Sequence, residues 1–222
     1  MESEETVYLA IDGKLIQIEG DMLGNTFDIN KSLNTLYYID NYDSEKDVGN
    51  LMVANIEEGA IVNAEVYDSE ISGGILFTLG EDSVIYTKDK KDNKYDLYFN
   101  KQLVDYDIAE YYFNPDTNEI LYFTEYDEEK TIGTLHVFKD GEKKKIAEEV
   151  LTDVEYLANG DIFYFVDYSS KSHKGDLYMY SDEESVKLDY DVSKLIFEKD
   201  IYNSNFVLCY TSFLNDIEFS VD

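Results

Sequence analysis

An aromatic run, a polar loop and a second apolar run containing a leucine recur along this chain, and this repeat constrains the fold more than any other feature. In three copies a tyrosine of the first run and the leucine of the second are 13 residues apart, and in one copy they are 11 apart. A repeat of this kind predicts one small structural unit per copy, stacked along the chain. The four clear copies are LYYIDNYDSEKDVGNLMV (36–53), VIYTKDKKDNKYDLYF (84–99), LYFTEYDEEKTIGTLHVF (121–138) and FYFVDYSSKSHKGDLYMY (163–180).

The segments between these copies read as further strands joined by tight turns. Asn159-Gly160 and Asp140-Gly141 are strong hairpin signals, and Asn114, Pro115 and Asp116 supply the turn residues of another hairpin. No window shows a sustained apolar period of 3.6 residues, which predicts few helices. Each unit is therefore expected to hold four short antiparallel strands, with its longest loop between the second and third.

Several second strands carry bulky apolar side chains on consecutive residues, as in Ile120-Leu121-Tyr122-Phe123. Successive side chains of a strand point to opposite faces of the sheet. A sheet with one face in water would alternate apolar and polar residues instead. These strands therefore need cover on both faces, which radially stacked sheets provide.

Weaker copies lie at both ends of the chain. VYLAIDGKLIQI (7–18) keeps the Gly-x-Leu spacing of Gly13 and Leu15 after a shorter loop, and is interpreted as a second and third strand. FVLCYTSFLNDIEF (206–219) is interpreted as part of a last, three-stranded unit, which TVYLAID (6–12) could complete.

The predicted fold is all-β, a single β-propeller-like domain over residues 1–222 with about six units, the terminal ones incomplete. The tyrosines of the four clear copies, Tyr38, Tyr86, Tyr122 and Tyr164, are 48, 36 and 42 residues apart, close to the 40–50 residues of a propeller blade. A two-sheet β-sandwich is the alternative, because many short strands at regular spacing also fit it. The unit boundaries fall at about 1–25, 26–72, 73–108, 109–151, 152–192 and 193–222.

The stretches FNPDTNEILYFTEYD (113–127) and DIFYFVDYSSKSHKGDLYMYSDEE (161–184) resemble the repeat of TolB-type β-propellers. In that family a turn like Ser-Pro-Asp-Gly precedes an apolar strand, and a strand like Asp-Leu-Tyr-Val follows. The resemblance extends over about residues 26–219, although only the turn at 114–118 keeps Pro-Asp and the tryptophan often found before that turn is absent. It implies a propeller that binds proteins, peptides or glycans, and it implies no catalytic residue.

The charge of the chain excludes some partners. Its 18 basic residues are all lysine and stand against 49 acids, a formal net charge of −31. Such a chain repels nucleic acid and anionic lipid headgroups, so neither nucleic-acid binding nor direct membrane contact is expected. A hydrophobic fraction of 44% with 15% aromatic residues still predicts a folded chain.

The acidic start MESEET lacks the features of a signal peptide. If the chain belongs to a longer bacterial surface protein or lipoprotein with an upstream anchor, it is an extracellular domain; otherwise it is cytoplasmic. Cys209 is the only cysteine, which excludes an internal disulfide and a cysteine-based zinc site.

The two histidines are weak candidates for chemistry. His173 could pair with Ser170 or Ser172 and an acid, Asp167 or Asp176, but the equivalent loops of the other copies have no histidine. His136 occupies a third-strand position where the other copies have Met52, Tyr98 and Tyr178, so we expect it to pack. No catalytic residue, metal ligand or cofactor is therefore assigned.

The acidic loops DNYDSEKD (40–47), DKKDNKYD (89–96) and EYDEE (125–129) occupy the same place in successive units. Carboxylates grouped at one rim could bind calcium. None of these loops fits the calcium-loop pattern, and lysines interrupt two of them, so solvated loops are the simpler interpretation.

Three loop tyrosines, Tyr42, Tyr126 and Tyr168, recur two residues after equivalent ends of the second strand. Tyrosine suits contact surfaces because its ring is apolar and its hydroxyl is polar. These residues are the candidate binding surface, against the alternative that they only cap the strand ends.

The sequence therefore favours a non-enzymatic scaffold that recognises a protein, peptide or glycan through rim loops. One alternative is an accessory or substrate-gating domain of a larger hydrolase or cell-surface enzyme. Structural packing against neighbouring domains is another.

Overall fold

The computed structural model describes residues 7–11, 14–18, 27–30, 32–72, 77–79, 83–114, 116–199 and 206–212. All regular secondary structure within these residues is β-strand, so the all-β prediction is confirmed for them. No helix in this part of the chain has the length and hydropathy needed to cross a bilayer. The chain divides into two compact units, residues 1–108 and 109–222, which are described in turn.

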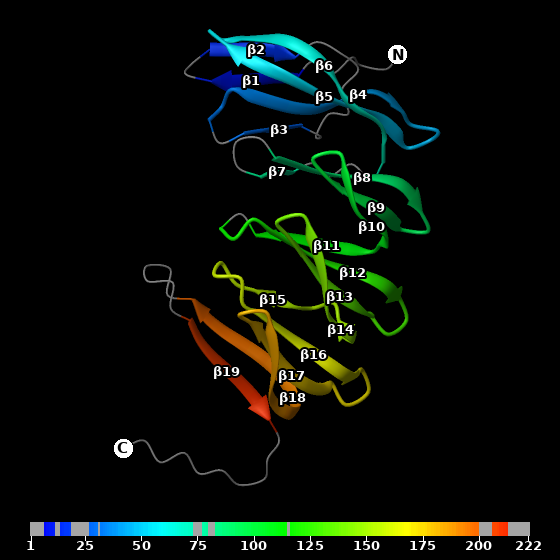
Figure 1. The fold of residues 1–222 in the computed structure, drawn as a ribbon, viewed down its shortest axis with the longest axis vertical. Coiled ribbons are helices and arrows are strands. Elements are labelled where there is room, and N and C mark those ends of the chain that lie inside the picture. The colour runs from blue at the N-terminus through cyan, green and yellow to red at the C-terminus, as the bar shows by residue number, and fades with distance from the viewer. Residues whose placement is uncertain are drawn as a thin grey trace. The chain divides into compact units, whose positions relative to one another are not determined.

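The first unit contains two antiparallel meanders and an N-terminal hairpin (Figure 1). Neighbouring strands in each meander are consecutive in sequence, as expected for strands joined by short turns. The hairpin is β1 (Val7–Ile11) and β2 (Lys14–Ile18); the first meander is β3 (Phe27–Ile29), β4 (Thr35–Asp43), β5 (Val48–Glu57) and β6 (Ala60–Ile71); the second is β7 (Phe77–Leu79), β8 (Ser83–Lys91), β9 (Lys94–Phe99) and β10 (Gln102–Ile108).

The second unit contains two further meanders and one additional strand. The third meander is β11 (Glu110–Asn114), β12 (Glu119–Asp127), β13 (Ile132–Lys139) and β14 (Glu142–Leu151); the fourth is β15 (Glu155–Tyr156), β16 (Ile162–Ser169), β17 (Lys174–Ser181) and β18 (Glu184–Lys199), to which β19 (Phe206–Ser212) adds.

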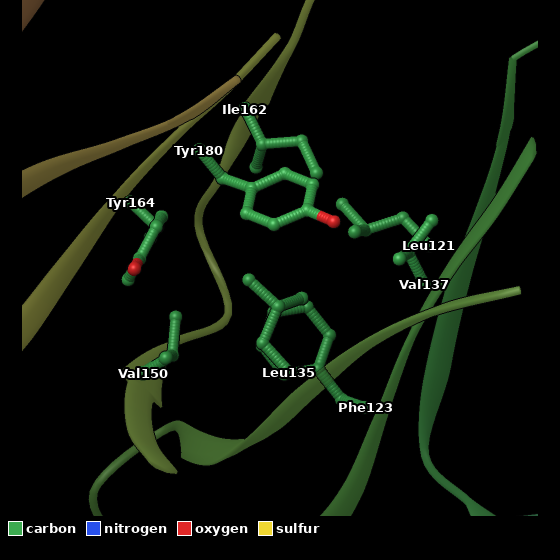
Figure 2. Packing of buried hydrophobic residues seen from close by; sticks show 8 residues of the cluster. All are labelled: Leu121, Phe123, Leu135, Val137, Val150, Ile162, Tyr164 and Tyr180. Carbon is green, nitrogen blue, oxygen red and sulfur yellow. The ribbon is translucent and has the colours of Figure 1, made fainter. Parts of the chain in front are cut away.

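Successive meanders of a unit share a single ladder position and pack their side chains together. The bridging pairs are Ile71 with Lys88 in the first unit and Val150 with Val166 in the second. In the second unit, side chains of β12, β13 and β14 form one apolar cluster with those of β16 and β17 (Figure 2). The cluster is Leu121, Phe123, Leu135, Val137, Val150, Ile162, Tyr164 and Tyr180.

The second strands bury both faces, as their consecutive apolar residues predicted. In β16, Ile162 and Tyr164 lie in the cluster shared with the third meander, whereas Phe163 and Phe165 lie in a second cluster with Leu177. The second strand β4 divides in the same way between a cluster shared with β8 and one shared with β2. At about 25 cal/mol per Å² of apolar surface removed from water, these doubly covered strands are the main source of stability.

The second and third strands keep one register in all four meanders. A tyrosine of the second strand pairs with a large side chain of the third: Tyr38 with Met52, Tyr86 with Tyr98, Tyr122 with His136, and Tyr164 with Tyr178. The neighbouring leucines Leu51, Leu97, Leu135 and Leu177 are each 0% exposed. This repeated register is why the sequence copies align.

The fourth strands share a feature that the sequence alignment missed. Each has an acid with a positive φ directly before a buried Ile or Val, and the ladder shifts there. The pairs are Glu70-Ile71, Asp107-Ile108, Glu149-Val150 and Asp191-Val192. Such bulges bend the strand and re-aim one side chain, here into the core.

The N-terminal hairpin has a tight connection. Ile11 pairs with Lys14, which leaves two residues between the strands. The third-to-fourth connections of all four meanders have this length, and so does the second-to-third connection between Lys91 and Lys94, so the interpretation of residues 7–18 as a second and third strand stays a prediction. Most of the expected third strand of the last unit lies outside the described residues.

Candidate functional site

The three candidate tyrosines lie where the ladder between second and third strands is interrupted. The residue before each has a positive φ: Asn41 at 51°, Glu125 at 53° and Asp167 at 53°. The register shifts at these points in β4, β12 and β16. The short side chains of Asn and Asp, as at Asn41 and Asp167, tolerate this left-handed conformation better than most others. One repeated bulge thus positions all three tyrosines.

Tyr42 belongs to the first unit and is held by charged neighbours. Its ring is half-buried against the cluster around Leu51, and its hydroxyl donates a hydrogen bond to the carboxylate of Asp47. Lys90 Nζ lies 2.6 Å from the other carboxylate oxygen of Asp47 and lowers the pKa of that acid together with Tyr42. The same hydrogen bond raises the pKa of Tyr42. This tyrosine is therefore oriented by a local network.

Tyr126 and Tyr168 belong to the second unit, where the β12–β13 and β16–β17 loops lie on the same side (Figure 1). Both side chains are half-buried. Burial and then the nearby negative charges of Glu110, Glu128 and Asp127 raise the pKa of Tyr126.

The ring of Tyr168 covers a glycine of the neighbouring strand. A Cβ placed on Gly175 would be 3.3 Å from Tyr168 Cδ2, so the glycine allows this close approach. The Phe165 ring lies 6.1 Å away, at a tilt of 56°. Tyr168 therefore covers the end of the sheet and keeps part of its ring accessible.

His173 occupies a turn position. Its φ is 54°, close to Asp47 at 56°, Asn93 at 59° and Thr131 at 55°, which precede the third strands of the other meanders. Its backbone N–H donates to the carbonyl of Ser169 at 2.7 Å, and its side chain is exposed. The position is thus defined by backbone conformation in all four loops.

His136 packs, as the sequence predicted. Its ring stacks on Tyr122 with centroids 5.0 Å apart and planes 11° apart, as Tyr98 stacks on Tyr86 and Tyr178 on Tyr164. Nε2 lies 3.0 Å from Thr124 Oγ1.

The acids of the second-to-third loops cap turns. Asp43 Oδ1 accepts the backbone N–H groups of Glu45 and Lys46, and Asp127 Oδ1 does the same for Glu129 and Lys130. Hydrogen bonds from these lysines hold the pKa of both acids below the usual range. Among the described residues, no group of three or more His, Cys, Asp or Glu side chains is arranged to hold a metal ion.

A polar groove of about 650 Å³ in the second unit was not foreseen. It lies among the turns of the β13–β14, β15–β16 and β17–β18 hairpins, and six acids and two lysines line it. Its residues are Glu119, Val137, Lys139, Asp140, Glu142, Lys144, Asn159, Gly160, Asp161, Tyr180, Ser181, Asp182 and Glu183. The run of acidic residues at successive hairpin turns was the only sequence signal that could have located it.

Glu119 is the buried acid of this groove. Lys139 Nζ lies 2.7 Å from one carboxylate oxygen, and the hydroxyls of Thr117 and Tyr156 donate to the other at 2.8 and 2.9 Å. Burial opposes the charge, but these three hydrogen bonds lower the pKa of Glu119. The charge is thus compensated within the fold, as buried ions require.

No family model matches the chain, and no curated protein matches it. Solved structures similar to it include a Mycobacterium tuberculosis puromycin-hydrolysing peptidase, at 12% identity and a TM-score of 0.46 over 83% of this chain and 33% of that one. A structure from a study of two prolyl endopeptidases has 10% identity and a TM-score of 0.49 over 77% of this chain and 29% of that one. The β-propeller domain of the Trilobed protease from Pyrococcus furiosus has 12% identity and a TM-score of 0.42 over 83% and 62%.

This chain spans about a third of the length of the first two of these chains. Because these TM-scores are below 0.5, the fold of this chain is assigned from its own strand pairings and not from these similarities.

Proposed function

We propose that this chain is a non-enzymatic binding scaffold of β-propeller type, which recognises a protein, peptide or glycan through the loops between the second and third strands. The meanders are its blades in this proposal. One face of β4 packs on the next meander and the other on the N-terminal hairpin, and β16 is also buried on both faces, one of them against the preceding meander. This burial supports a radial arrangement over a two-sheet sandwich, in which outer faces are solvated.

The repeated bulge is the observation that carries the proposal. It places Tyr42, Tyr126 and Tyr168 at equivalent ends of second strands, each beside acids and each with part of its ring accessible. Oriented aromatic rings beside hydrogen-bonding groups are typical of recognition surfaces, because they offer contact area at little cost in side-chain entropy. The pairing of Tyr42 with Asp47 adds to this orientation.

The ligand in this proposal is neutral or cationic. A chain with a net charge of −31 disfavours polyanions, including nucleic acid and anionic membranes. Sugars stack on aromatic rings and accept hydrogen bonds from hydroxyls, and peptides with lysine or arginine gain from the acids.

The test uses the full chain on a printed glycan array and a random 12-residue peptide library. Binding by the wild-type chain that falls at least tenfold in the double variant Tyr126→Ala/Tyr168→Ala is the expected result. The matched control is Tyr106→Ala/Tyr190→Ala, because these tyrosines are 59% and 65% exposed on fourth strands, away from the loops.

The half-buried rings of Tyr126 and Tyr168 also contribute to stability, so each alanine variant is paired with a phenylalanine variant that keeps the ring. Equal binding by wild type and the folded loop variants would contradict the proposal and favour simple capping of the sheet.

A further inference from the structure

The groove around Glu119 lies at the end of the strands opposite to the candidate tyrosines. Glu119 is the first residue of β12, and Tyr126 is the next to last. The other lining residues come from the β13–β14, β15–β16 and β17–β18 hairpins, all within the second unit. A volume of about 650 Å³ is in the usual range for small-molecule sites. A ligand bound here would be separate from the proposed recognition surface.

The groove is more acidic than the chain as a whole. Six of its 13 lining residues are acids, against 49 of 222 in the sequence. A pocket of about 480 Å³ beside the β5–β6 turn of the first unit has no charged side chain among the described residues that line it. Its residues are Leu15, Ile16, Gln17, Tyr38, Gly59, Ala60, Ile61 and Ala64. A pocket beside such a turn therefore does not require acids, and those of the groove are a property of its own sequence.

The lysines of the groove neutralise only part of this charge. Lys139 Nζ lies 2.7 Å from Glu119, and Lys144 Nζ lies 3.3 Å from a carboxylate oxygen of Glu183. No described lysine forms an ion pair with the four remaining acids, which are Asp140, Glu142, Asp161 and Asp182. Nor are three of these carboxylates grouped to hold a metal ion in the part of the chain that the structure describes. Positive charges spaced along an organic ligand suit such an arrangement better.

The groove also has an aromatic wall that already holds an ammonium group. The Tyr180 ring is 8% exposed and is fixed by the apolar cluster between the third and fourth meanders (Figure 2). Lys144 Nζ lies 5.6 Å from the centroid of this ring and donates to the backbone carbonyl of Glu183 at 2.7 Å. An aromatic face with oxygen acceptors beside it is a common binding site for alkylammonium groups. The chain's own lysine thus shows which chemical group the groove accepts.

The two ion pairs of the groove differ in how easily they can be exchanged. The side chains of Lys144 and Glu183 are 46% and 82% exposed, and exposed pairs of this kind contribute only about 0–1 kcal/mol. The carboxylate of Glu119 is 12% exposed and also accepts two hydroxyl hydrogen bonds. An incoming cation can therefore replace the Lys144 ammonium at little cost, while the pair of Glu119 with Lys139 stays in place.

We propose that this groove binds a ligand with two or more alkylammonium groups. One of them replaces the Lys144 ammonium over the Tyr180 ring, and the others lie among the four acids that have no lysine partner. Two sources supply this chemistry: a free linear polyamine, and neighbouring lysine side chains of a peptide.

The test is isothermal titration calorimetry of the full chain in about 0.15 M salt, where attraction between distant charges is screened. The probes are spermidine and the peptide acetyl-Lys-Lys-Lys-amide, each with three ammonium groups. Tighter binding of spermidine would assign a free polyamine, and tighter binding of the peptide would assign a peptide partner. If neither probe bound, the proposal would be overturned.

A pair of matched variants separates the groove from the general charge of the chain. Asp140→Asn/Asp182→Asn is expected to weaken binding about tenfold, as the loss of two partly exposed charge pairs predicts. The control is Asp89→Asn/Asp92→Asn, which removes the same charge from the β8–β9 hairpin and leaves binding unchanged. All four acids are exposed and have φ between 49° and 54°, a conformation that asparagine tolerates. Equal weakening by both double variants would overturn the proposal.

The exchange at Tyr180 has its own test. Lys144→Met removes the competing ammonium and is expected to strengthen binding about threefold, the effect of one exposed ion pair. Lys145→Met makes the same change of charge one residue further along β14, where the side chain points to the other face and pairs with Glu148, so binding stays unchanged. No gain in Lys144→Met, or an equal gain in Lys145→Met, would contradict the exchange.

Discussion

The β8–β9 and β12–β13 hairpins have the same strand register and different loops. Both bury a tyrosine that stacks on a third-strand ring, with centroids 5.4 Å apart for Tyr86 and Tyr98 and 5.0 Å apart for Tyr122 and His136. Their loops differ in length, and they also differ in chemistry because Lys90 occupies the place of Tyr126.

The two hairpins also differ at one position of the third strand. Gly133 faces Val150 across the third and fourth strands, whereas the half-buried Tyr95 faces Ile108 at the equivalent place. Packing between meanders therefore determines the strands, and the loops vary around a shared bulge. Substitutions in the strands should therefore cost more stability than substitutions in the loops.

The largest effect is expected in the shared strands. Leu97 and Leu135 are both 0% exposed, so Leu97→Ala and Leu135→Ala should each lower the free energy of unfolding by about 3 kcal/mol. Urea unfolding measures both, with Val66→Ala as a control because Val66 is 54% exposed. A cost below about 1 kcal/mol at either leucine would show that the two strands are not equivalent.

A smaller effect is expected where the hairpins diverge. A Cβ on Gly133 would lie 3.0 Å from the carbonyl oxygen of Thr124 and 3.3 Å from Phe123 Cδ1, so Gly133→Ala should cost about 2 kcal/mol.

Its control is Gly141→Ala, where a Cβ meets nothing within 4 Å but φ is +84°, so the cost is about 1 kcal/mol of backbone strain. Tyr95→Ala should be tolerated about as well as Gly141→Ala. If Gly133→Ala proved neutral, close approach would not explain the glycine.

Two acids of the first unit, Asp68 in β6 and Asp96 in β9, should shift stability with pH in opposite directions. Burial of Asp68 opposes its charge, but hydrogen bonds from Tyr86, the Ser69 N–H and Lys88 together lower its pKa. Burial and then nearby acids raise the pKa of Asp96, against the hydrogen bond from the Asp107 N–H.

A lowered pKa in the folded state contributes stability above the unfolded pKa of about 4 and loses it as the pH falls through the folded value. A carboxyl group whose pKa is raised in the folded state instead lowers stability above the unfolded pKa, where the group is charged. Asp68→Asn should therefore reduce stability at pH 7 by about 1 kcal/mol and flatten its decline below pH 4, whereas Asp96→Asn should leave stability at pH 7 equal or slightly higher. Chemical denaturation from pH 2 to 7 measures both, and equal losses at pH 7 would contradict the assignment.

The smallest effect is expected at His173. Asparagine tolerates a φ of 54°, so His173→Asn should change the free energy of unfolding by less than about 0.5 kcal/mol, whereas His173→Val should cost more. The same variants test the non-enzymatic proposal with ester and peptide substrates, because hydrolysis by the wild-type chain that disappears in His173→Asn would contradict it.

The sequence could predict the strands because their pattern has one dominant cause. Burial of both faces requires consecutive apolar residues. The common register places a tyrosine and a leucine, such as Tyr122 and Leu135, at the same positions in every copy. It could also place His136 by comparing it with Tyr98 and Tyr178.

The remaining features depend on backbone conformation or on distant residues. The positive φ of Asp107 before Ile108 follows from a bulge that no residue type specifies alone, and the register of the β1–β2 hairpin depends on turn length. The groove around Glu119 is assembled from three hairpins, and its compensation by Lys139 and Tyr156 joins residues far apart in sequence.

The central claim, that strands hold the fold while second-to-third loops carry recognition, is tested most directly by a loop exchange. Residues 125–132 of the β12–β13 hairpin are replaced by residues 89–94, which lie between the equivalent pairs Thr124–Thr134 and Lys88–Asp96, and Gly133 is kept because a side chain there would meet Thr124 and Phe123. Urea unfolding should show a loss of no more than about 1 kcal/mol, while binding to the glycan or peptide selected by the wild-type chain falls at least tenfold. A loss of about 3 kcal/mol, as for Leu135→Ala, or unchanged binding by a folded protein would contradict the account.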